Sequence, residues 1–203
     1  MDILSAGGLL LLPIIVCGLL SAFIVIERVF YFRAIDRRDE ELEKSLDLAF
    51  AKYDYVTAET LCTSAETPLG IVLKKAIQSK KKLAEADMRE VVQNEMDLVV
   101  PMFDRWIGFL STIANVAMLL GLLGTVIGNI RAFSVLGEGG SLLNQEILAE
   151  AIAQSLVTTA AGLIVAIPTF VAFGFLSRAS EKRISEMERF VTTILLKLTG
   201  RLV

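Results

Sequence analysis

Three long stretches without a charged residue constrain the fold of this chain more than any other feature of its sequence. They contain no Asp, Glu, Lys or Arg and cover residues 3–26, 106–130 and 151–177. A bilayer core of about 30 Å is crossed by about 20 helical residues, at about 1.5 Å of rise per residue. Each stretch is longer than that, and the mean hydropathy of the chain is +0.63. The sequence therefore predicts an all-α membrane protein with three transmembrane helices.

The basic residues predict the orientation of these helices. Four arginines follow the first stretch within residues 28–38, and three basic residues follow the third within residues 178–183. Residues 132–150 contain glutamates and no basic residue. The positive-inside rule then places the N-terminus outside, and the segment after the first helix and the C-terminus in the cytoplasm. With a net charge of −3 and no strong basic patch, the sequence does not suggest a nucleic-acid partner.

These features divide the chain into six segments. The first stretch is interpreted as a retained anchor, because it lacks a basic leader and exceeds the 7–15 apolar residues of a signal peptide. The predicted segments are a first transmembrane helix (1–33), a cytoplasmic helical domain (34–104), a second transmembrane helix (105–134), a periplasmic loop (135–148), a third transmembrane helix (149–177) and a cytoplasmic C-terminal helix (178–203).

The cytoplasmic domain shows helical periodicity that extends the membrane helices inward as a bundle. Apolar residues at Leu42, Leu46, Ala49 and Phe50 predict an amphipathic helix within residues 37–65. Another helix is expected to begin at Pro68, and a long one to follow through residues 88–99. Pro101 is expected to kink the chain where that helix would enter the second span.

The composition excludes several kinds of chemistry. The chain has no histidine, so His-ligated metal sites and Ser-His or Cys-His catalysis are excluded. Cys17 and Cys62 lie in different segments, and a disulfide between them is not expected. The segment GLLGTVIG (121–128) lacks the lysine and the preceding strand of a phosphate-binding loop. Neither an enzyme nor a metal or cofactor site is predicted.

The second and third stretches each carry small and polar residues along one helical face. At 100° per residue, four polar residues of the second stretch fall within about 80° and six small or polar residues of the third within about 100°. One interpretation is a shared surface, such as a pore wall or a slot for another helix. The other is packing, because a small-xxx-small step lets helices approach and Ser or Thr hydroxyls bond their own helix. The residues are Ser111, Asn115, Thr125 and Asn129 in the second stretch, and Ser155, Thr158, Thr159, Gly162, Ala166 and Thr169 in the third.

An intramembrane proton relay normally needs an Asp, Glu or His. The second and third stretches contain none, and Glu27 lies at the inner edge of the first, beside Arg28. An interfacial ion pair is the simpler interpretation of those two residues. If this chain conducts protons, the carboxylate must come from another polypeptide.

Two segments resemble the signature segments of the ExbB/TolQ/MotA proton-channel family: LGLLGTVIGNIRAF (120–133) and AIAQSLVTTAAGLIVAIP (151–168). Three spans, a large inner domain after the first and a basic tail are typical of its ExbB and TolQ branches. The resemblance implies a ring, a pentamer, around a pore that holds the helices of two ExbD- or TolR-like single-span partners, each with an intramembrane Asp. Such a motor would drive TonB- or Tol-type work from the bacterial inner membrane.

The resemblance also assigns residues. Thr125 matches the Thr of GLLGTV and Thr159 the Thr of the third-span segment, and both are expected to face the partner's Asp. Many members carry Glu where this chain has Gln154, which makes the predicted pore mouth less acidic. The predicted ion pathway and partner contact also include Thr158, Ser155, Asn129 and Asn115, and the predicted helix-packing residues are Gly121, Gly124, Gly128, Gly162 and Pro168.

Several functions remain open at this point. The first hypothesis is an ExbB-type subunit that energises TonB-dependent outer-membrane transport. The alternatives are a TolQ-type subunit of the Tol-Pal envelope system and a non-conducting membrane scaffold. A MotA-type subunit is disfavoured because that branch adds a fourth span, and a small-molecule transporter because no broken, charged helix is present.

Overall fold

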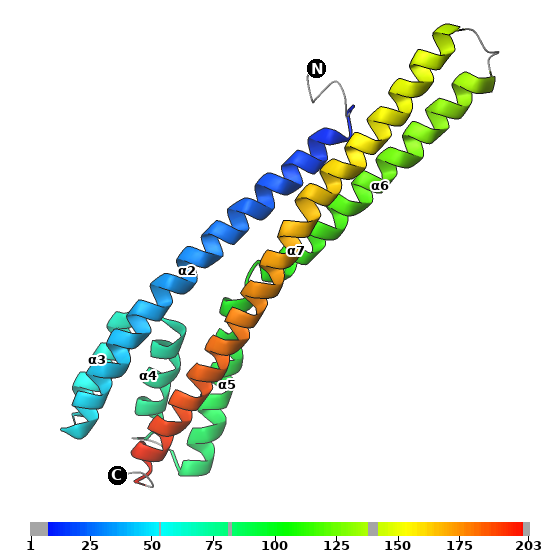
Figure 1. Ribbon diagram of the computed structural model, residues 1–203. Coiled ribbons are helices and arrows are strands. Elements are labelled where there is room, and N and C mark those ends of the chain that lie inside the picture. Colours follow the sequence, from blue (N-terminus) through cyan, green and yellow to red (C-terminus); the bar gives the residue numbers. More distant parts are fainter. Residues whose placement is uncertain (1–7, 53, 81–82, 138–141, 201–203) are drawn as a thin grey trace. The chain divides into compact units, whose positions relative to one another are not determined.

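The fold was obtained as a computed structural model that describes residues 8–52, 54–80, 83–137 and 142–200. These residues form six α-helices and no β-strand, which confirms the predicted all-α fold for the described part of the chain. The helices are α2 (Leu11–Ala51), α3 (Tyr55–Ala65), α4 (Pro68–Lys80), α5 (Glu85–Asp104), α6 (Ile107–Gly137) and α7 (Leu142–Leu198) (Figure 1).

Three helical segments are long and apolar enough to cross a membrane. They are Leu11–Ala51, Glu85–Val135 and Gln145–Leu198, and each contains an 18-residue window with a mean hydropathy of 2.0 or 2.1. By length and composition they agree with the three predicted spans. The predicted ring assembly stays a prediction.

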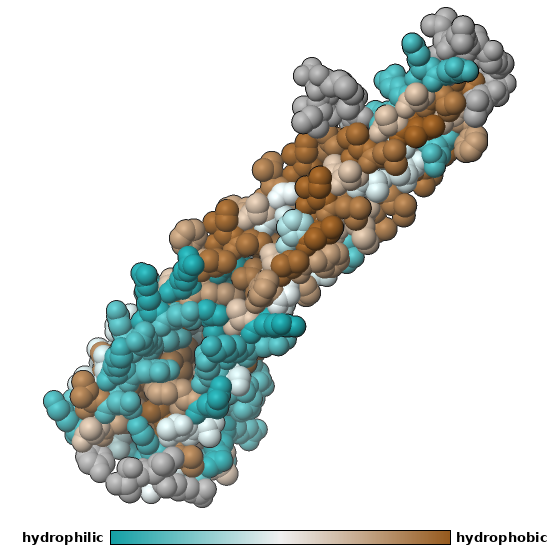
Figure 2. All heavy atoms as spheres, in the orientation of Figure 1, coloured by the Kyte–Doolittle hydropathy of each residue, from teal (hydrophilic) through white to brown (hydrophobic). Residues whose placement is uncertain are grey.

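The chain forms two compact units, to which α2 and α7 both contribute. The first, called the apolar unit here, comprises residues 1–27 and 106–175; the second, called the polar unit, comprises residues 28–105 and 176–203. Figure 2 shows mostly apolar side chains on the surface of the apolar unit and many polar ones on the polar unit. Large apolar side chains such as Phe133 and Ile164 are 72% and 71% exposed, as expected for a surface that faces lipid.

The core of the apolar unit includes small side chains beside larger ones such as Ile14. Leu110, Ala114 and Ala117 of α6 are fully buried. Helix α2 approaches α7 closely at Gly18, where an added Cβ would lie 3.2 Å from a methyl group of Val165. Small residues replace bulky ones here because membrane helices associate by close backbone packing rather than by the hydrophobic effect.

The polar unit is packed as the sequence predicts. Leu42, Leu46 and Ala49 of α2 are buried, as the amphipathic spacing predicted, and Phe50 is half-buried. α4 begins at Pro68, also as predicted. The buried side chains contributed by α5 are Met88, Val92, Met96, Val99 and Phe103, and those contributed by the end of α7 are Met187, Val191, Ile194 and Leu198.

The amphipathic helix predicted within residues 37–65 is interrupted. α2 ends at Ala51 and α3 begins at Tyr55, with Asp54 as its N-cap. The Asp54 carboxylate accepts a hydrogen bond from the Thr57 backbone N–H at 3.0 Å. An aspartate in this position satisfies a free amide of the new helix and so favours a helix start.

The break before the second span lies beyond Pro101, where a kink was expected. Pro101 lies inside α5, which ends at Asp104, and Trp106 has a left-handed backbone with φ of 66°. Proline removes a single intrahelical hydrogen bond, whereas a left-handed residue stops the helix. The Arg28 side chain donates to the Met102 carbonyl at 3.4 Å. Pro168 also lies inside a helix, α7, which continues past it.

Candidate ion-conducting site

Gly121, Gly124 and Gly128 of α6 and Gly162 of α7 lie where these two helices approach each other closely. A Cβ built on Gly162 would lie 2.6 Å from the Ala117 carbonyl oxygen, and one on Gly121 would lie 3.2 Å from the Thr158 carbonyl oxygen. A Cβ built on Gly124 would overlap the side chain of Thr158, and one built on Gly128 would overlap the side chain of Ser155. Real Cβ atoms essentially never lie within 3.0 Å of another heavy atom, so only glycine permits this approach at Gly124, Gly128 and Gly162.

Two of the predicted pathway hydroxyls lie inside this helix pair. Ser155 and Thr158 are 3% and 2% exposed. The Ser155 hydroxyl donates to the Ile152 carbonyl at 2.7 Å, and that of Thr158 has the Gln154 and Ser155 carbonyls at 3.1 and 2.9 Å. These bonds satisfy the hydroxyls within their own helix, the packing arrangement expected of Ser and Thr in membrane helices.

Thr159 and Thr125 are half-buried and lie at the edge of the helix pair. The Thr159 hydroxyl reaches across to the Gly121 carbonyl oxygen at 2.9 Å and lies 3.2 Å from the Ser155 carbonyl. In an α-helix the Gly121 carbonyl also accepts from the N–H of Thr125, four residues on. The Thr125 hydroxyl donates to the Leu122 carbonyl at 2.6 Å. One carbonyl therefore connects the two threonines that the sequence singled out.

The remaining predicted pathway residues do not join this contact. Asn115 and Asn129 are exposed on α6, away from the buried glycine face. The polar stripe expected from helical spacing thus includes a buried part between α6 and α7 and an exposed part on α6. Whether the exposed amides take part in ion transfer stays a prediction.

Sequence reasoning did not find the contact between Arg131 and Gln154. The Arg131 guanidinium donates to the side-chain oxygen of Gln154 at 3.4 Å. Both residues line a cavity of about 260 Å³ that also reaches Gly128 and Ser155. The antiparallel order of the two predicted spans, which brings the end of one beside the start of the other, is the signal that could have found it.

The ion pair predicted between Glu27 and Arg28 stays a prediction. Arg28 is 2% exposed, and its guanidinium lies 4.4 Å from the centre of the Tyr31 ring in addition to its bond to Met102. Among the described residues, no group of three or more His, Cys, Asp or Glu side chains is arranged to hold a metal ion.

Together these features define a class: a multi-pass, all-α membrane protein whose second and third spans form one close pair. The comparison with known families is more specific. The family model described as the MotA/TolQ/ExbB proton channel family matches residues 64–189, more than half of the chain. This chain belongs to that family.

Its relatives include several ExbB proteins. It is 30% identical to the biopolymer transport protein ExbB of Aquifex aeolicus, over 66% of this chain and 86% of that protein. It is 25% identical to the biopolymer transport protein exbB1 of Vibrio cholerae, over 95% of this chain and 86% of that protein. An ExbB-like 3 protein of Synechocystis sp. is 27% identical over 82% of this chain and 79% of its own length. The chain is therefore an ExbB-type subunit of a proton-channel family, which is not a class of enzymes.

Proposed function

We propose that this chain is the ring-forming subunit of a proton-driven motor in the bacterial inner membrane. It acts with an ExbD-like single-span protein that carries an Asp in its span. Through a TonB-like protein, the motor energises outer-membrane transport. The observation that carries the proposal is the half-buried Thr159 hydroxyl, bonded to the Gly121 carbonyl beside Thr125. The family model and the ExbB relatives support it.

The chemistry of a hydroxyl suits both states of a titrating carboxyl. Thr159 has one O–H donor and two acceptor lone pairs. Toward a neutral carboxylic acid it accepts a hydrogen bond while it keeps its own bond to Gly121. Toward an ionised carboxylate, which only accepts, it turns its proton away from the Gly121 carbonyl. The threonine can thus bind the carboxyl before and after proton transfer.

The missing carboxylate explains the need for a second polypeptide. The charge-free residues 106–130 and 151–177 offer hydroxyls, amides and carbonyls but no group that titrates. A proton-driven cycle requires such a group within the membrane. An Asp on a partner helix, placed against Thr125 and Thr159, supplies it.

A closed ring would also shelter the exposed amides of Asn115 and Asn129 from lipid. Polar groups that face lipid cost free energy, so the polar face that carries these amides and the edge with Thr125 and Thr159 is expected to face an enclosed axis. Heterologous contacts repeated by rotation close into such a ring, and the family resemblance suggests five copies.

Mass measurement of the detergent-purified complex tests this proposal. Co-expression with an ExbD-like protein should give one species with several copies of this chain, five by our expectation, together with the partner. Expression alone should give the ring without the partner. A purified monomer that does not bind the single-span protein would contradict the proposal.

A further inference from the structure

A half-buried aspartate in the polar unit, Asp39, has no part in the proposed ion pathway. Asp39 lies on α2, and its Oδ1 atom is buried without a hydrogen-bond partner among the described residues. The side chain of Thr67 lies near this carboxyl and lowers its pKa. The Thr67 hydroxyl also accepts from the Gly70 N–H at 3.1 Å, at the first turn of α4. Asp39 therefore lies beside the start of α4, and it lines one cavity with Leu69 of that helix.

The cavity around Asp39 is rich in acidic groups. It has a volume of about 220 Å³ and lies within the polar unit. From α2 it is lined by three further carboxylates, and from α7 by one carboxylate and one guanidinium. The parts contributed by α4 and α5 are apolar. The lining residues are Asp36, Asp39, Glu40, Glu43, Leu69, Phe103, Arg183, Glu186 and Met187.

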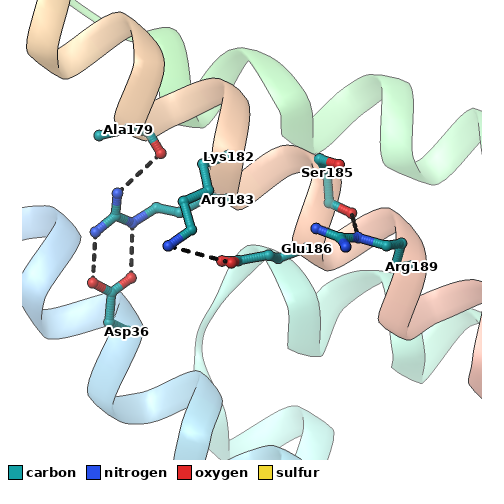
Figure 3. A network of polar contacts seen from close by, with 7 residues as sticks. All are labelled: Asp36, Ala179, Lys182, Arg183, Ser185, Glu186 and Arg189. Atoms are coloured by element: carbon teal, nitrogen blue, oxygen red, sulfur yellow. Dashed lines mark hydrogen bonds and ion pairs between the residues drawn. The ribbon is translucent and has the colours of Figure 1, made fainter.

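The single guanidinium that lines this cavity, that of Arg183, is hydrogen-bonded to residues other than Asp39. Figure 3 shows Arg183 of α7 paired with Asp36 of α2 through two hydrogen bonds, from Nε at 2.7 Å and from Nη2 at 2.5 Å. Its third nitrogen donates to the Ala179 carbonyl at 3.0 Å. The guanidinium also lies 4.3 Å from the centre of the Phe32 ring. Lys182 of α7 pairs with Glu186 at 3.6 Å (Figure 3).

Within the described part of the chain, Asp39 is therefore not paired with a cation. The pKa of Asp39 is raised to about 6, chiefly by burial; Thr67 opposes this increase, and the charges of Glu43 and Asp36 contribute to it. When Asp39 is ionised, its unpartnered oxygen requires water and its charge repels the neighbouring carboxylates. When it is neutral, both costs disappear.

We propose that Asp39 is a proton-operated latch that tightens the packing of α2 against α4 and α7 when it binds a proton and loosens it when it ionises. The raised pKa of Asp39 determines whether the stability of the polar unit rises or falls with pH. Because the folded state holds this proton more strongly than the unfolded state, the stabilisation is present at low pH and is lost as the pH rises through about 6. The inference rests on the polar unit and does not depend on the proposed ion pathway.

Hydrogen exchange of the full chain in detergent, corrected for intrinsic exchange rates, tests the latch. Amides of residues 36–46 and of α4 should be several-fold better protected at about pH 5 than at about pH 7.5. Asp39→Asn, which resembles the neutral acid, should show the high protection at both pH values. Glu41→Gln, an exposed control on the same helix, should keep the wild-type pH dependence.

A second variant tests the same latch without altering Asp39. Glu43→Gln removes a neighbouring negative charge, so the pH midpoint of protection should move to a lower value. Equal protection of the wild type at both pH values would overturn the proposal. So would an unchanged midpoint in Glu43→Gln, or an Asp39→Asn variant that keeps the wild-type pH dependence.

Discussion

The Cys62 thiol shows how burial of a single residue sets its chemistry. The side chain is 3% exposed in α3. The pKa of Cys62 is raised to about 12, chiefly by burial; the charge of Glu59 contributes to the increase and that of Lys74 opposes it. The thiolate, not the thiol, is the nucleophile, so Cys62 is expected to be inert while the polar unit is folded.

Maleimide labelling at about pH 8 checks this expectation. In a Cys17→Ser background, Cys62 should react slowly in the folded protein and fully after denaturation. A matched control carries Ser64→Cys with Cys62→Ser, because Ser64 lies exposed on the same helix. That control should label quickly in the folded state. Equal rates for the two would show that the thiol is accessible and ionised.

At the same scale, the sequence predicted the type of the candidate site residues but not their partners. Helical spacing grouped Ser155, Thr158 and Thr159 on one face. A face about 100° wide includes both the centre of a helix contact and its edge. The structure separates the buried Ser155 and Thr158 from the half-buried Thr159. The Thr159 bond to Gly121 depends on the distance between helices, which spacing along one helix does not contain.

At the scale of elements, the close contact of α6 and α7 depends on Gly162. A methyl group there would meet the Ala117 carbonyl oxygen at 2.6 Å and the Gly121 Cα at 3.0 Å. These are backbone atoms, which cannot rotate away. Gly162→Ala should therefore destabilise the protein by about 1–3 kcal/mol, despite the better helix propensity of alanine.

The same helix supplies the control. Gly174 has no atom within 4 Å of an added Cβ. Gly174→Ala should therefore be neutral or slightly stabilising. Thermal unfolding of both variants in detergent measures the difference. An equal midpoint for Gly162→Ala and the wild type would show that α6 and α7 are not held at this distance.

The helix boundaries show where sequence reasoning succeeds for elements. Pro68 begins α4 as predicted, because proline has no amide hydrogen to lose at a helix start. The break at Trp106 was not predicted, since no sequence rule favours a left-handed tryptophan. Asp54 could have been recognised as a cap, but the strong periodicity around it indicated an uninterrupted helix.

At the scale of the whole molecule, the orientation in the membrane stays a prediction that labelling can test. The positive-inside rule places residues 34–104 in the cytoplasm and the start of α7 in the periplasm. Glu90→Cys and Glu146→Cys, both at exposed positions, should therefore label oppositely with an impermeant reagent in a background without Cys17 and Cys62. Labelling of Glu90→Cys from outside intact cells would show that the predicted orientation is wrong.

The central claim is that the hydroxyls of Thr125 and Thr159 serve proton transfer in the assembled complex. Valine has nearly the shape of threonine but neither donates nor accepts a hydrogen bond. Thr125→Val and Thr159→Val should assemble normally, because an intramembrane hydrogen bond contributes only about 0.6 kcal/mol on average. Thr112→Val is the matched control, since Thr112 is an exposed threonine of α6 outside the proposed site.

Proton flux into vesicles that contain the complex with its single-span partner tests this claim most directly. Both site variants should lose most of the flux, because a carboxylate without a hydrogen-bond partner shifts toward its neutral form and stops exchanging its proton. Thr159→Ser, which keeps the hydroxyl, should retain much of it. If the assembled Thr125→Val and Thr159→Val complexes conduct protons as well as Thr112→Val, the two threonines serve packing alone and the proposed site is wrong.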